Sequence, residues 1–142
     1  MNAEELLELL RDFHIEATKK GLLQKRDKHN LSFIQRSLLK ILSMKNHPVS
    51  MTKMCALLCV KKSAMTRIID RMEKNNLVTR SDITGDRRSY GLALTEKGSA
   101  LIPHLNTVPV AVLEKILSQC TPGEKKAVIE GYRTLLEKLR EI

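Results

Sequence analysis

Polar and basic side chains gather on one face of the segment 62–75. Ser63, Arg67 and Lys74 recur at helical spacing, with Thr66 and Arg71 beside them. A guanidinium can bind a guanine edge or a phosphate, and a hydroxyl can bond to either. If the segment is helical, this face has the chemistry to enter a DNA groove. The alternative is an ordinary solvated helix surface.

A second basic group lies in the turn-rich stretch 81–88. Arg87 and Arg88 follow Asp86 there. An arginine at a hairpin tip can enter the minor groove of DNA, where the negative potential is strongest. Asp86 can pair with a guanidinium and fix its direction. The stretch therefore has the composition of a DNA-contacting tip.

The thiols and imidazoles form no site of recognisable spacing. Cys55 and Cys59 are four residues apart and Cys120 stands alone, so the odd count without a CxxC pair indicates a reduced, cytoplasmic location. Cys55 falls on an apolar stripe, which favours a packing role, and Cys59 is the better candidate for redox sensing. The histidines, which are scattered along the chain, predict no metal site. These histidines are His14, His29, His47 and His104. No catalytic or cofactor-binding motif is present.

The positive charge is concentrated in the middle of the chain. Of the net charge of +9, +8 lies in residues 31–90, where 31–60 holds four basic and no acidic residues and 61–90 holds eight basic and four acidic. Such a concentration indicates a polyanionic partner. Aromatic residues make up 3% of the chain, which argues against single-strand binding by base stacking.

The central elements that must position these side chains form a known order. Apolar residues at spacings of three and four predict helices over 51–58 and 62–75, joined by a short turn at 59–61. Alternating residues then predict strands over 77–80 and 89–94. The stripes are Met51, Met54, Cys55 and Leu58 in the first helix, and Met65, Ile68, Ile69 and Met72 in the second. This order predicts a winged helix-turn-helix.

Amphipathic helices flank this module. They are expected over 3–20, from Ser32 to the stop before Pro48, from Thr95 to about 119, and after the capping box at 121–124. Pro103 and Pro109 should kink or break the third of these. The terminal helices have little chain to cover them, so they either pack within the monomer or, as we favour, pair across a two-fold axis.

The expected architecture is a single domain, mainly α with a small β-hairpin wing. Residues 31–99 form the DNA-binding lobe, and 1–30 with 100–142 form the dimerisation helices. A chain of 142 residues fits one domain without disulfide or metal staples. No apolar run is long enough for a membrane span.

Longer motifs resemble one known family. Asp86-Arg87-Arg88 followed by Leu94-Thr95-Glu96-Lys97-Gly98 is similar to the wing signature of the multiple-antibiotic-resistance regulator (MarR) family, and residues 62–73 resemble its recognition helix. Leu31-Ser32 with Gln35 and Leu39 resembles the start of its second helix. The resemblance covers residues 31–100 closely and the flanking helices in layout.

The resemblance implies a homodimeric regulator, mostly a repressor, on a pseudo-palindromic double-stranded operator. Such repressors are released by small organic effectors, metals or oxidants. The resemblance implies that Ser63, Ala64, Thr66 and Arg67 face bases or phosphates, that Arg88 with Arg87 serves the wing, and that Asp86 braces it. The predicted DNA-binding residues also include Lys61, Lys62 and Arg71.

This chain departs from the family pattern at three positions. Cys59 replaces the usual turn glycine, where a side chain has to accept a positive φ. Lys61 replaces a serine cap, and Gly91 replaces a leucine.

Three other functions compete with this reading. One is a regulator that senses oxidants through a cysteine. A second is a winged-helix protein-interaction module, for which the recognition face should be less basic and the wing arginines absent. The third, an enzyme, lacks any recognisable catalytic frame.

Overall fold

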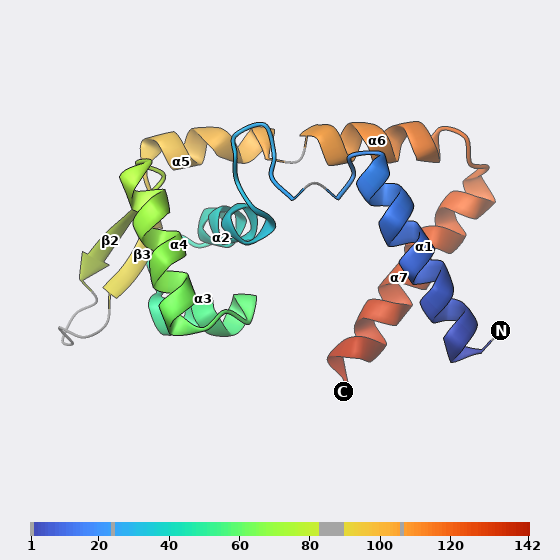
Figure 1. Cartoon of the computed structure of the whole chain (residues 1–142), viewed down its shortest axis with the longest axis horizontal. Helices are drawn as coiled ribbons and strands as arrows, with labels where there is room; N and C mark the ends of the chain where they lie inside the picture. Colours follow the sequence, from blue (N-terminus) through green and yellow to red (C-terminus); the bar gives the residue numbers. More distant parts are fainter. Residues whose placement is uncertain (1, 24, 83–89, 106) are drawn as a thin grey trace. The chain divides into compact units, whose positions relative to one another are not determined.

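The computed structural model describes residues 2–23, 25–82, 90–105 and 107–142, with side chains at 82 and 107–109 left aside (Figure 1). The chain divides into two compact units. One consists of Met1–Leu23 with Thr107–Ile142, and the other of Gln24–Asn106. Each unit is described by itself.

The central unit is a winged helix. Its elements are α2 (Phe33–Ser43), β1 (Val49–Ser50), α3 (Met51–Leu58), α4 (Lys62–Lys74), β2 (Val78–Asp82), β3 (Tyr90–Leu94), α5 (Glu96–Leu101) and the 3-10 turn η1 (Ile102–His104). The sheet is antiparallel with strand order β1-β3-β2. The expected helix pair and hairpin are therefore confirmed.

Strand β1 was not foreseen from the sequence. Its two residues, Val49 and Ser50, pair with Leu92 and Gly91 of β3. A two-residue strand shows no periodicity, so only its partner defines it. Gly91, which replaces a leucine in the family pattern, is buried in the central strand between Ser50 and Ser81.

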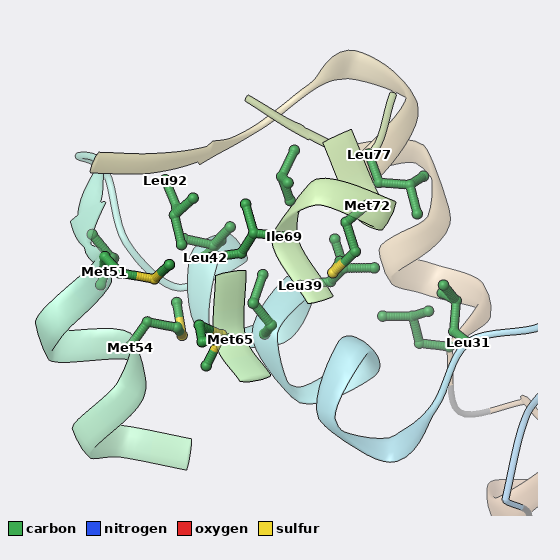
Figure 2. Packing of buried hydrophobic residues seen from close by; sticks show 14 residues of the cluster. Leu31, Leu39, Leu42, Met51, Met54, Met65, Ile69, Met72, Leu77 and Leu92 are labelled. Atoms are coloured by element: carbon green, nitrogen blue, oxygen red, sulfur yellow. The ribbon is translucent and has the colours of Figure 1, made fainter. Parts of the chain in front are cut away.

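Side chains from α2, α3, α4 and all three strands meet in one core (Figure 2). The predicted stripes supply it, since Met51, Met54, Met65, Ile69 and Met72 are buried. Cys55, Leu58 and Ile68 are partly buried and pack against the cluster. The unbranched methionines fill irregular gaps between the two helices and the sheet. Burial of this stripe fixes which face of α4 points outward.

Local caps set the ends of the helices in the central unit. Ser32 and Gln35 form a reciprocal capping box at the start of α2. The predicted cap at Thr95 is also confirmed, because its hydroxyl accepts from the N–H of Gly98. Cys59 ends α3 with φ 52° and ψ 43°, so the positive φ expected at this turn is present.

The second unit contains α1 (Ala3–Lys19), α6 (Thr107–Leu117) and α7 (Pro122–Arg140). Thr121 and Glu124 form the predicted capping box of α7. The helix expected from Thr95 to 119 is interrupted by η1 at Pro103. Pro109 breaks nothing, because it lies in the first turn of α6, where a missing N–H costs no helical bond.

The apolar stripes of α1 and α7 are largely exposed. Ala17 is the one residue of α1 that is buried, and α7 has none among its described side chains. Within the described part of the chain, no helix is both long and apolar enough to cross a membrane.

Candidate nucleic-acid interface

The outward face of α4 presents six of the expected contact residues to solvent. Because Met65, Ile69 and Met72 point into the core, the opposite side of the helix is left outside. The exposed residues are Lys61, Lys62, Ser63, Ala64, Arg67 and Arg71. Among the described residues, none of the four cations in this set has a carboxylate partner. Their charges are therefore available to an anion.

The start of α4 adds a backbone dipole to these charges. Lys61 is the N-cap, and its side chain makes no capping hydrogen bond, as its replacement of serine led us to expect. The first N–H groups of a helix have no partner within the helix and carry partial positive charge. Lys61, Lys62 and these amides therefore form a cationic end suited to a phosphate.

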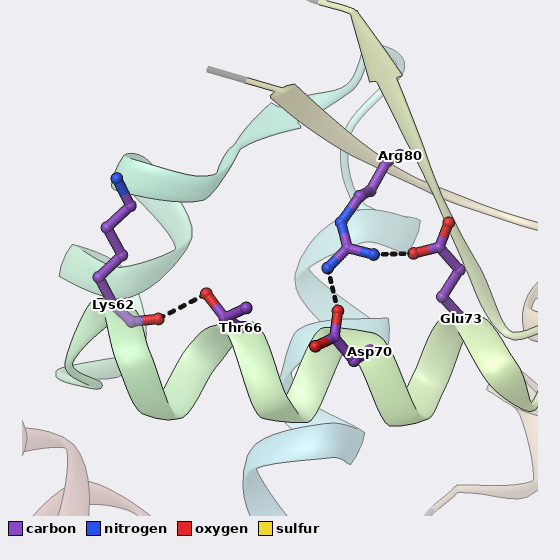
Figure 3. A network of polar contacts seen from close by, with 5 residues as sticks. All are labelled: Lys62, Thr66, Asp70, Glu73 and Arg80. Atoms are coloured by element: carbon purple, nitrogen blue, oxygen red, sulfur yellow. Dashed lines mark hydrogen bonds and ion pairs between the residues drawn. The ribbon is translucent and has the colours of Figure 1, made fainter. Parts of the chain in front are cut away.

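Thr66 differs from its neighbours because its hydroxyl is already bonded. The Oγ1 of Thr66 donates to the carbonyl oxygen of Lys62 at 2.9 Å (Figure 3). The residue is half-buried. Its side chain thus presents a methyl group and the oxygen lone pairs, with the donor proton committed to the helix.

Arg80 of β2 joins the sheet to α4. Its guanidinium pairs with Asp70 and Glu73, two α4 residues three apart (Figure 3). It also lies 5.0 Å from the centroid of the Tyr90 ring on β3. The hydrogen bond with Asp70, and with smaller effects Tyr90 and Glu73, raises the pKa of Arg80 further above its ordinary value. One arginine thereby ties both wing strands to the recognition helix.

This network also changes the electrostatics of the outer face. Asp70 falls on the polar side of α4, where an unpaired carboxylate would repel a phosphate backbone. The single positive charge of Arg80 lies against the carboxylates of Asp70 and Glu73, so it reduces this repulsion and leaves one carboxylate charge uncompensated. Sequence reasoning did not include Arg80, since no periodicity links residues ten positions apart. Its one available signal was a basic residue on a strand beside an acidic helix turn.

The remaining expected contacts, Asp86, Arg87 and Arg88, lie outside the described residues. The strands that lead into and out of their segment, β2 and β3, are paired from Val78 with Leu94 to Asp82 with Tyr90. Their role at the DNA stays a prediction.

The three cysteines differ in their exposure to solvent. Cys59 is exposed, while Cys55 and Cys120 are partly buried, and none forms a disulfide. Across the described ranges, no three His, Cys, Asp or Glu side chains are grouped closely enough to hold a metal ion.

A cavity of about 570 Å³ lies elsewhere in the central unit. Leu42, Leu92 and Ile102 contribute apolar walls, and Lys45 and His47 lie on the lining near the α2–β1 turn. Nδ1 of His47 donates to the carbonyl of Pro48 at 3.0 Å, because a carbonyl can only accept. This leaves Nε2 and the ammonium of Lys45 for a polar ligand group.

This fold is a winged helix-turn-helix, a class of nucleic-acid-binding proteins. It is defined by the helix pair α3 and α4, the three-stranded sheet and the exposed basic face of α4. Residues 34–90 match the model of the MarR family, and the chain belongs to this family.

Relatives of known role share this assignment. The transcriptional repressor MprA of Escherichia coli K12 is 27% identical over 106 residues, which cover 75% of this chain and 60% of MprA. The HTH-type transcriptional repressor MdtR of Bacillus subtilis is 30% identical over 104 residues, 72% of this chain and 66% of MdtR. The crystal structure of the transcriptional regulator BldR from Sulfolobus solfataricus is 27% identical, with a TM-score of 0.69 over 97% of this chain and 99% of BldR. The chain thus spans less than two thirds of the length of both repressors.

Proposed function

We propose that this protein is a sequence-specific, double-stranded DNA-binding transcription regulator that acts as a homodimeric repressor. The observation that carries this proposal is the outer face of α4, where Lys61, Lys62, Arg67 and Arg71 are exposed and have no carboxylate partner among the described residues. Lys61 and Lys62 lie at the N-terminus of this helix. The pairing of Asp70 and Glu73 with Arg80 supports it, since this pairing lowers the repulsion between these carboxylates and an approaching anion. The relatives MprA and MdtR are named as repressors, which supports repression as the direction of regulation.

The exposed terminal helices support the homodimer. In α1, Leu7, Leu9 and Phe13 are each more than half exposed, and in α7 Tyr132 and Leu139 are 65% exposed. Contiguous apolar surface of this kind marks an interface. A second copy of the same helices covers it by two-fold symmetry. Two recognition helices then meet a pseudo-palindromic operator whose half-sites lie about one helical turn apart.

The proposal includes release of the repressor from its operator by a small organic effector. The cavity beside Lys45 and His47 supports it, because apolar walls with a cationic edge suit an apolar molecule with one anionic group. Its described lining residues include no acidic side chain.

A binding assay with a matched control tests the DNA-binding function. Fluorescence anisotropy with labelled duplex DNA is measured over a series of salt concentrations for the wild type, Arg67→Gln and Lys126→Gln. Lys126 lies on α7, is exposed and makes only a loose contact with Glu130 at 3.9 Å. Its substitution removes the same charge from a helix outside the proposed DNA-binding face.

The wild-type affinity should fall steeply as salt rises, because bound counterions are released from the phosphates. Arg67→Gln should weaken binding, and a lost phosphate contact lowers the salt slope by about 0.9. Lys126→Gln should behave as the wild type. A wild-type affinity that does not depend on salt would contradict DNA binding and favour the protein-interaction module.

A further inference from the structure

Among the expected contact residues that the structure describes, Thr66 is the one whose polar group is already occupied by a hydrogen bond. Its hydroxyl proton is donated to the carbonyl of Lys62 at 2.9 Å, within the first turn of the same helix (Figure 3). A threonine hydroxyl has a single proton, so none remains for a base acceptor such as guanine O6 or N7. This bond also holds the side-chain rotamer, because only some χ1 values bring Oγ1 to the preceding turn.

The position of Thr66 is one that base edges can reach. It lies in the N-terminal half of α4, adjacent in sequence to exposed Arg67 and one turn before Asp70. The N-terminal residues of a recognition helix are those that contact bases in the major groove. Thr66 is half-buried, so part of its side chain remains accessible.

A fixed methyl group has one complementary partner in the major groove. Of the four bases, thymine alone presents a methyl there. Resting on the proposed DNA-binding function, we propose that Thr66 reads a thymine in each half-site through its methyl group, while its hydroxyl takes no part in base recognition. The competing possibility is that the oxygen lone pairs accept from the amino group of adenine or cytosine.

The two possibilities separate in a pair of conservative substitutions. Thr66→Val keeps a methyl at this position and removes the hydroxyl, whereas Thr66→Ser keeps the hydroxyl and removes the methyl. Thr134→Ser on exposed α7 is the matched control. Thermal unfolding of all three variants shows whether each folds like the wild type.

The probe is a set of duplexes enriched by the wild-type protein from a random-sequence pool. Each thymine of the enriched duplex is replaced singly by uracil, which removes only the 5-methyl group. For the wild type, one position in each half-site should show about a fourfold loss of affinity, the size expected for one buried methyl group. Thr66→Val and Thr134→Ser should retain that loss, and Thr66→Ser should bind thymine and uracil equally at that position.

Three outcomes would overturn the inference. If Thr66→Val loses affinity while Thr66→Ser retains the preference for thymine, the hydroxyl makes the contact. If both variants discriminate thymine from uracil as the wild type does, Thr66 touches no thymine. If the random pool is not enriched at all, the proposed function fails, and this inference fails with it.

Discussion

Replacement of Arg80 by glutamine tests whether the wing is fastened to the recognition helix by this one side chain. The substitution leaves a polar side chain of similar length and removes the charge. It disconnects Asp70 and Glu73 of α4 from β2 and removes the contact with Tyr90. The core beneath is not altered, because Arg80 is outside the buried cluster.

The magnitude follows from the exposure of the partners. The side chain of Arg80 is 30% exposed, and those of Asp70 and Glu73 are 58% and 38% exposed. Solvent-screened pairs of this kind contribute about 0.2–1 kcal/mol each, and an exposed cation–π contact about 0.5–1 kcal/mol. We therefore expect Arg80→Gln to lower the free energy of unfolding by about 1–3 kcal/mol.

Urea unfolding at a fixed protein concentration measures this loss, since the stability of a dimer depends on concentration. A double-mutant cycle of Arg80→Gln with Asp70→Asn isolates the pair. Specific DNA affinity should also fall while its salt slope stays constant, because a guanidinium held by two carboxylates contacts no phosphate. Unchanged stability together with a coupling energy near zero would refute the fastening role. A reduced salt slope would show that Arg80 binds DNA directly.

Three further outcomes are expected. Gly98→Ala should destabilise the protein by about 3 kcal/mol in urea unfolding, because an added Cβ would lie 2.0 Å from the carbonyl oxygen of Leu77. Gly131→Ala should instead stabilise α7 by about 0.5–1 kcal/mol, because its added Cβ would meet nothing within 4 Å. Equal effects of the two substitutions would contradict the steric argument. Cys59→Gly should leave stability unchanged or raise it by up to about 1 kcal/mol, because it relieves a left-handed conformation; a clear loss would show that the side chain matters more than the backbone. A backbone N–H at the start of α7 holds the pKa of Glu124 below its ordinary value. The stabilisation that Glu124 gives to α7 is therefore present above the pKa of the unfolded state and is lost as pH falls through the pKa of the folded state. Circular dichroism should show a loss of helix in acid that Glu124→Gln lessens, and identical acid profiles of wild type and variant would contradict this.

Much of the lobe was predictable because its signals are local. The apolar stripes of α3 and α4, the caps at Ser32 and Thr95 and the stop before Pro48 each depend on neighbours within about four residues. The left-handed turn at Cys59 was expected from the family resemblance instead, because the family usually has a glycine at this turn position. Local geometry and propensity act before any long-range contact forms.

The exposed cationic face of α4 was also accessible from sequence. Once the buried stripe of a helix is known, its opposite face follows from 3.6-residue periodicity. Ser63 and Arg67 were placed on that face in this way, and their exposure agrees. Whether this face binds DNA is the proposal above.

Only the tertiary structure decided which elements are tied together. The pairing of Val49 with Leu92 creates β1, and the contacts of Arg80 with Asp70 and Glu73 link a strand to a helix. Such contacts depend on the angles at which packed elements cross, and periodicity along one element carries no record of those angles. The sequence by itself therefore determined the helices, their caps and their charged face. The packing of the sheet against α4 determined which carboxylates pair with Arg80 and which cations remain available to a polyanion.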